Sequence, residues 1–412
     1  MKTPRNDIKS LFCTSDIYKY YNIYIIPDNL EQLNRPASTG RLFMRKLALF
    51  ALLLCTSKCL MAQNGNKAEL NGLVGLSSFT AEKYKLPGHL LGAEFAYHFD
   101  MANNKAPYIR ILNIQAIDAV FGMRSFNNVS VIDSVSTTHP IGHVYTVMGR
   151  LEIPIVKLGG TRLVFSPALG VAYATGTYFS NGNPLIGSHI NLCTQAGVFI
   201  STPLSQTIAI KGGIDIFHYS NGAVRVPNNG INTVEASFGL IKTLNTPGPQ
   251  TNSKAFSEFY KHSFEIGFDV GRRGVQKAEG GLYKTGFSAA YNYRLSPVLS
   301  LKAGGEAVYY YTLYHPDNDP KTNLEPTYQY HGTSFDRWRY GLSGGADLWM
   351  GRLAIMANYG FYLHYKSTTK INSYWTPGVK YYVLPWMALQ VKAYIHGSDC
   401  DYLGGGLIFR AH

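Results

Sequence analysis

The sequence predicts an all-β protein whose antiparallel strands span a membrane and close into one or two β-barrels. Apolar residues make up 46% of the 412 residues and charged residues 15%, which excludes a disordered polypeptide. The mean hydropathy of −0.07 is too low for a bundle of membrane helices, and no run of about 18 apolar residues follows residue 63. Instead, many segments of roughly 10–15 residues alternate apolar and polar side chains, as the strands of membrane barrels do.

These alternating segments form two blocks of about eight. The first block comprises 68–79, 89–99, 108–124, 142–156, 162–179, 188–201, 206–220 and 231–242. A linker rich in Pro, Asn and Ser follows at 243–254. The second block comprises 263–273, 286–295, 298–313, 336–350, 352–365, 374–383, 388–395 and 402–409. The pattern predicts either tandem eight-stranded barrels or one sixteen-stranded barrel, and the linker favours the tandem arrangement.

The connections between these segments differ in length. Three of them are short and tight, at 202–205, 295–297 and 384–386. Three others are long and polar, at 181–186, 221–230 and 315–333. Short periplasmic turns and long outer loops are typical of outer-membrane barrels.

The first 62 residues precede the strands. Residues 44–62 have the basic start, short apolar core and small-residue end of a secretory signal peptide, so we predict export to the cell outer membrane. Residues 1–43 are predicted to be an upstream extension foreign to the native protein, the alternative being a genuine cytoplasmic extension or anchor. Residues 63–243 then form the first barrel, and residues 255–412 a second eight-strand block of unknown function.

Side chains of equal parity share one face of a strand. In segment 207–220 the odd positions include Lys211 and Asp215, which belong in a barrel interior. The even positions therefore face lipid, and they are Ile208, Ile210, Gly212, Ile214, Ile216, His218 and Ser220. We expect His218 and Ser220 at the outer end of this wall.

The next strand continues the same face. Asn232 starts its outward, mostly aliphatic even set and is predicted to lie near the depth of His218 and Ser220. Glu235 has the opposite parity and is predicted to face the interior.

The motif His218-Tyr-Ser220-Asn221-Gly222, followed by Pro227-Asn-Asn-Gly-Ile-Asn232, resembles the signature of the outer-membrane lipid A 3-O-deacylases, the acyloxyacyl-hydrolase-like family. The upstream segment 183–191 resembles the branch of this family with longer chains. The resemblance covers residues 68–242 and leaves the segment after Lys254 unexplained.

The resemblance implies a role for each motif residue. His218 corresponds to the general base and Ser220 to the nucleophile, while Asn221 and Gly222 correspond to the oxyanion and substrate-binding positions. Serine needs such a base, and a tetrahedral oxyanion needs fixed donors. The i, i+2 spacing places His218 and Ser220 about 6–7 Å apart along the strand, so side-chain rotation must close the gap.

The third family position departs from the pattern, since Asn232 stands where the family has Glu. An amide oxygen can orient an imidazole but brings no charge to stabilise imidazolium. The predicted function is thus an ester hydrolase that removes an acyl chain from lipid A. The alternative is a non-catalytic barrel, a pore or a structural or lipid-binding wall, that retains a degenerate active site.

The remaining features predict no cofactor and no metal. Only Cys193 and Cys400 follow residue 63, without metal-type spacing. His189 is expected to pack a barrel wall or loop base. Nine basic and four acidic residues precede residue 63, which leaves a net charge of +8 out of +13 for the exported part. For an exported barrel this charge favours the phosphates of lipid A over nucleic acid as the partner.

Overall fold

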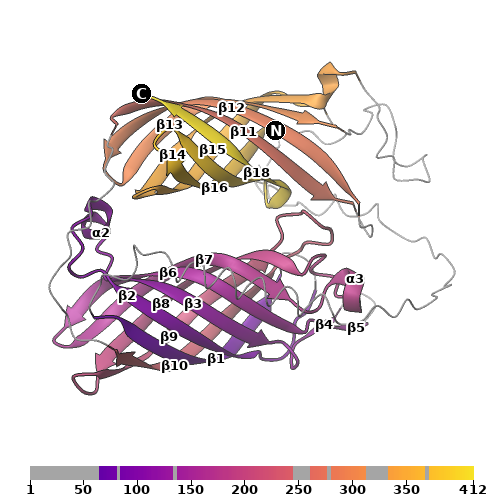
Figure 1. The fold of residues 1–412 in the computed structure, drawn as a ribbon. Coiled ribbons are helices and arrows are strands. Elements are labelled where there is room, and N and C mark those ends of the chain that lie inside the picture. The colour runs from indigo at the N-terminus through magenta and orange to yellow at the C-terminus, as the bar shows by residue number, and fades with distance from the viewer. Residues whose placement is uncertain are drawn as a thin grey trace, which may run out of the picture. The chain divides into compact units, whose positions relative to one another are not determined.

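The computed structural model describes residues 65–80, 84–132, 137–244, 260–275, 280–311, 333–366 and 371–412 (Figure 1). The predicted upstream extension and signal peptide lie outside these residues, as does most of the linker. Within the described residues, the search for membrane spans finds no helix of sufficient length and hydrophobicity.

The first barrel has eight strands in a closed antiparallel sheet (Figure 1). In spatial order they are β1 (Lys67–Phe79), β10 (Ile231–Thr243), β9 (Ile208–Ser220), β8 (Ile190–Pro203), β7 (Thr161–Ala174), β6 (His143–Leu158), β3 (Ala116–Ser125) and β2 (Leu91–Asp100). Pairing of β1 with β10 from Lys67↔Thr243 to Phe79↔Asn232 closes the sheet.

The second barrel is closed in the same way by pairing of its first and last strands. Its strands follow chain order: β11 (His262–Gly274), β12 (Gly281–Ser296), β13 (Leu299–Tyr310), β14 (Trp338–Met350), β15 (Leu353–His364), β16 (Ser373–Leu384), β17 (Met387–His396) and β18 (Asp399–Ala411). The tandem arrangement is therefore confirmed, and the single sixteen-stranded barrel is excluded.

Some predicted strands were too long. The segment predicted at 108–124 begins with a short helix, α2 (Pro107–Ile111), because proline occupies its first turn. The segment predicted at 162–179 ends at β7, and α3 (Tyr178–Asn181) follows, terminated by Gly182 in the left-handed conformation. The strand predicted at 336–350 starts with the single turn η2 (Phe335–Arg337).

A small hairpin outside the barrel was not predicted. It consists of β4 (Ser130–Ile132) and β5 (Thr138–Pro140), and it belongs to the long connection between β3 and β6. Strands of three residues are too short to produce a readable alternation.

The interior of the first barrel is filled by paired charges. Arg150 donates to Glu69 at 2.7 Å and to Asp118 at 2.8 Å, and Lys211 donates to Glu152 at 2.6 Å. These side chains are buried. Eight strands enclose only enough space for side chains, so this barrel has no open channel.

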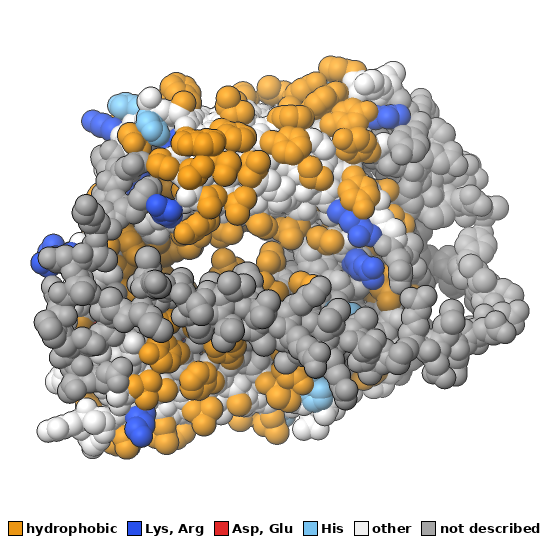
Figure 2. All heavy atoms as spheres, in the orientation of Figure 1, with side chains coloured by type: hydrophobic (Ala, Val, Ile, Leu, Met, Phe, Trp, Pro, Cys, Tyr) orange, Lys and Arg blue, Asp and Glu red, His pale blue; other side chains and the backbone are white. Residues whose placement is uncertain are grey.

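Apolar side chains cover the outward surfaces of the strands (Figure 2). On β12 of the second barrel, the outward set includes Tyr283, Phe287 and Tyr291. The two tyrosines stand about 26 Å apart along the strand, with Phe287 between them, and aromatic residues at both edges of an apolar band are typical of outer-membrane barrels. Both barrels thus have the outer surface of a membrane protein.

Long loops close one end of the first barrel over an apolar cluster. Three connections, β1–β2, β3–β6 and β7–β8, contribute Leu90, Phe126, Ile141 and Leu185, which pack there with the inward ends of neighbouring strands, among them Tyr219. The short connections lie at the opposite end, for example between Leu158 and Thr161. The cluster gives the ends of β9 and β10 a rigid backing at the long-loop end.

Candidate active site

The two faces of β9 are oriented as the alternation predicts. Ile214 and Ile216 are 56% and 53% exposed, whereas Lys211 and Asp215 are each 2% exposed. His218 and Ser220 continue the outward series at the end of the strand. They therefore lie on the lipid-facing wall, at the end that carries the long loops.

Three side chains on this wall form one hydrogen-bonded chain. Residues His218 and Asn232 are direct partners in the β9–β10 ladder. The His218 ring contacts Asn232 Oδ1 through Nδ1 at 2.8 Å and Ser220 Oγ through Nε2 at 3.1 Å. Side-chain rotation thus closes the gap that the strand spacing leaves between His218 and Ser220.

The orientation of the Asn232 amide fixes the tautomer of His218. Asn232 Nδ2 donates to the carbonyl oxygen of Phe79 at 3.3 Å, across the β1–β10 seam. Asn232 Oδ1 is then an acceptor toward the ring, so Nδ1 must carry hydrogen and Nε2 must present its lone pair to Ser220. A neutral imidazole in this tautomer can accept the serine proton.

Asn221 organises the loop that follows Ser220. Its backbone N–H donates to Asn228 Oδ1 at 2.8 Å, and its side-chain Nδ2 donates to the Arg225 carbonyl oxygen at 3.0 Å. Its Oδ1 accepts from the Arg225 N–H at 3.4 Å. A carboxamide has two N–H groups, and the bond to Arg225 uses one of them.

Gly230, the glycine of the segment Pro227–Asn232 in the motif, borders the His218 ring. It has a φ of +64°, which disfavours residues with a Cβ. A Cβ at Gly230 would lie 2.8 Å from His218 Cε1, closer than van der Waals contact permits. Gly230 was quoted from the sequence only within the segment Pro227–Asn232 of the motif, and no role of its own was predicted for it.

Replacing Gly230 by alanine is expected to lower the reactivity of the Ser220 hydroxyl about tenfold or more, because the added methyl group displaces the His218 ring from Ser220. The rate at which a fluorophosphonate probe labels Ser220 would measure this loss. Gly149→Ala is the matched control, since its Cβ would meet nothing within 4 Å. Normal labelling of the Gly230→Ala protein would contradict the role of Gly230.

Glu235 faces the interior, as predicted from its parity. It is 0% exposed and accepts a hydrogen bond from Arg124 Nε at 2.9 Å, and Thr233 also donates to it. It therefore does not replace the missing carboxylate beside His218. His189, which contacts the Ala174 carbonyl oxygen and stacks on Tyr173, packs at a loop base as expected.

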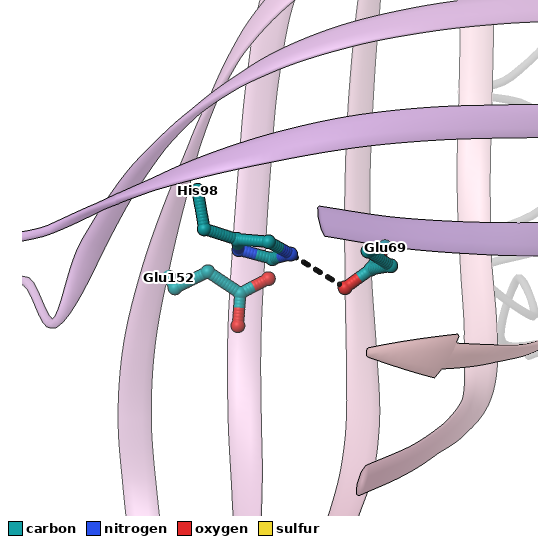
Figure 3. Close-up of side chains that lie close together, drawn as sticks. All are labelled: Glu69, His98 and Glu152. Atoms are coloured by element: carbon teal, nitrogen blue, oxygen red, sulfur yellow. Dashed lines mark ion pairs between the residues drawn. The ribbon is translucent and has the colours of Figure 1, made fainter. Parts of the chain in front are cut away.

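One histidine and two glutamates form a cluster inside the first barrel. The atoms of Glu69, His98 and Glu152 that could bind a metal ion lie within 4.8 Å of one another, and His98 Nε2 is 3.0 Å from Glu69 Oε2 (Figure 3). The carboxylates already accept hydrogen bonds from Arg150 and Lys211. The cluster is thus part of the ion-pair layer that fills the barrel.

Two protein-family models match separate parts of the chain. Residues 132–240 match the family model for lipid A 3-O-deacylase (PagL), and residues 259–412 match the acyloxyacyl hydrolase C-terminal domain. The second match covers the block to which the sequence analysis gave no function. No curated protein matches the chain.

Solved structures of outer-membrane barrels are also similar to the chain. The outer membrane enzyme PagL is 15% identical over 42% of this chain and 97% of its own, with a TM-score of 0.28. The outer membrane protein Omp33 of Acinetobacter baumannii is 9% identical over 85% of this chain and 99% of its own, with a TM-score of 0.17. From the two family matches, the chain carries a domain of the lipid A 3-O-deacylase family followed by an acyloxyacyl hydrolase C-terminal domain.

Proposed function

We propose that this protein is a serine ester hydrolase that removes an acyl chain from lipid A in the outer leaflet of the outer membrane. The observation that carries the proposal is the hydrogen-bonded chain Ser220–His218–Asn232 on the lipid-facing wall. The match of residues 132–240 to the deacylase family supports it, because that segment contains all three residues.

The geometry supports a two-step acyl transfer. Ser220 Oγ attacks the ester carbonyl carbon while its proton passes to His218 Nε2. The remaining amide hydrogen of Asn221 and the N–H of Gly222 would stabilise the oxyanion. The sugar oxygen leaves with the proton from His218, and water then hydrolyses the acyl-enzyme by the same route in reverse.

The surroundings of Ser220 suit an amphiphilic substrate. Ile214 and Ile216 lie below His218 on the outer face and would contact acyl chains. Loop 221–230 lies beyond the strand end and would reach the level of the lipid headgroups. A lipid ester, which joins sugar to acyl chain, is located between these two layers.

The second candidate function is a non-catalytic barrel with a degenerate site. Asn232 favours it, because an amide cannot stabilise the imidazolium by charge. The filled interior of the first barrel argues against the pore version of this alternative. Mass spectrometry of lipid A from cells with and without the protein separates the two functions, since only a deacylase removes the mass of one acyl chain.

Export of the protein is proposed to depend on the signal peptide at residues 44–62. Deleting residues 1–43 is expected to leave a normally processed outer-membrane protein whose N-terminus lies near Gln63. Mass spectrometry of the mature N-terminus in the outer-membrane fraction measures this. Loss of export on that deletion would contradict the assignment of Met44 as the start.

A further inference from the structure

Two of the loops beside the candidate site contain a single Lys, Arg, Asp or Glu residue between them. Loop 175–189 connects β7 to β8, and loop 221–230 connects β9 to β10. Together they contain no Asp, Glu or Lys, and Arg225 is their only arginine. The charge that an approaching lipid headgroup meets in these loops is therefore a single cation.

Hydrogen bonds hold the backbone of Arg225 close to the nucleophile. The side-chain amide of Asn221 binds both backbone groups of Arg225. Its Nδ2 donates to the Arg225 carbonyl oxygen at 3.0 Å, and its Oδ1 accepts from the Arg225 N–H at 3.4 Å. Asn221 directly follows Ser220 in the chain. Because of these two contacts, the position of Arg225 is coupled to that of Ser220.

A neighbouring loop holds the Arg225 side chain. Its guanidinium lies over the ring of Phe179 in α3, 5.4 Å from the ring centroid. Among the residues that the structure describes, no carboxylate forms an ion pair with Arg225, whereas Arg124 and Arg150 in the interior both have carboxylate partners. A guanidinium without a carboxylate partner can donate a pair of parallel N–H groups to two oxygens of one phosphate.

We propose that Arg225 binds a phosphate group of a phosphorylated glycolipid and thereby determines which lipids are held at Ser220. The inference rests on the proposed function, since it assigns a phosphate subsite to the same lipid-binding wall. Arg225 is a specificity residue and takes no part in the bond-breaking steps. It provides a contact that a dephosphorylated lipid of the same acyl composition cannot make.

Binding to a protein that cannot turn over tests the subsite apart from catalysis. The full chain carrying Ser220→Ala is titrated with bisphosphorylated lipid A and with its dephosphorylated form, both in nonionic detergent micelles. Adding Arg225→Ala is expected to weaken binding of the phosphorylated lipid about 10- to 100-fold, as for other charged hydrogen bonds, and to leave the dephosphorylated lipid unchanged. Arg225→Lys should retain part of the affinity because it keeps the charge.

Arg162→Ala is the matched control, because it removes the same charge at the short-turn end of the same barrel. The subsite would be overturned if Arg225→Ala weakened the binding of both lipids equally, if Arg162→Ala weakened the binding of the phosphorylated lipid as much, or if Arg225→Ala did not weaken binding at all. Inorganic phosphate is titrated alone as a second probe, and binding as tight as that of the lipid would overturn the glycolipid assignment. If the parent chain proves inactive while binding still depends on Arg225 and phosphate, the subsite stands and only the proposed catalysis fails.

Discussion

Replacing Ser220 by alanine is expected to lower lipid A deacylation by about a thousandfold or more, the typical cost of removing a nucleophile from a catalytic set. The loss should appear in kcat, because the lipid contacts of the wall are unchanged. Folding should be unaffected, since the Ser220 side chain hydrogen-bonds to His218 and its hydroxyl lies at a strand end.

Mass spectrometry of lipid A from cells that express each variant measures the effect. Ser188→Ala is a matched control, because Ser188 is another hydroxyl at the long-loop end and donates only to the Ile190 carbonyl oxygen at 2.8 Å. Retained thermal and detergent stability would show that both variants fold. Full deacylation by the Ser220→Ala protein would contradict the mechanism.

Replacing Asn232 by glutamate is expected to raise kcat about 10- to 100-fold, because a carboxylate stabilises the imidazolium that forms when Ser220 attacks. The kcat of the Asn232→Glu protein should still be lower than that of an enzyme with a native Ser-His-Glu triad. The carboxylate cannot donate to the Phe79 carbonyl oxygen, so the contact that now fixes the Asn232 side chain is lost.

Two further variants at this position separate charge from orientation. Asn232→Asp keeps the side-chain length, places a carboxylate oxygen against the Phe79 carbonyl oxygen, and should gain less than glutamate. Asn232→Leu removes the acceptor of His218 and should lose activity. If glutamate gave no increase while leucine left the rate unchanged, Asn232 would have no part in the reaction.

The sequence predicted strand faces better than element ends. Charged and aliphatic side chains alternate strictly along β9, so one residue such as Lys211 determines the direction of every neighbour. The helices α2 and α3 and the hairpin β4–β5 escaped prediction, because their short segments lack a period of their own. Closure into two barrels was left open, because it depends on which distant strands pair at each seam.

The alternation of side chains along the strands also predicted part of the candidate site. His218 and Ser220 are two residues apart on one strand, and Asn232 is brought opposite them by the next, so parity alone placed all three on one wall. The contact of Asn232 with Phe79 joins residues 153 positions apart. The approach of Gly230 to the ring depends on a loop conformation that alternation does not encode.

The seam between β1 and β10 bears on when the proposed activity would arise. Phe79 and Thr80, at the end of β1, contact Asn232 and Asn229, at and before the start of β10. The orienting amide is therefore fixed only after the earliest and latest strands of the barrel have met. A newly exported chain whose barrel is still open lacks this arrangement, so hydrolytic competence would arise together with completed membrane insertion. Such timing would restrict lipid cleavage to the membrane in which the barrel has closed.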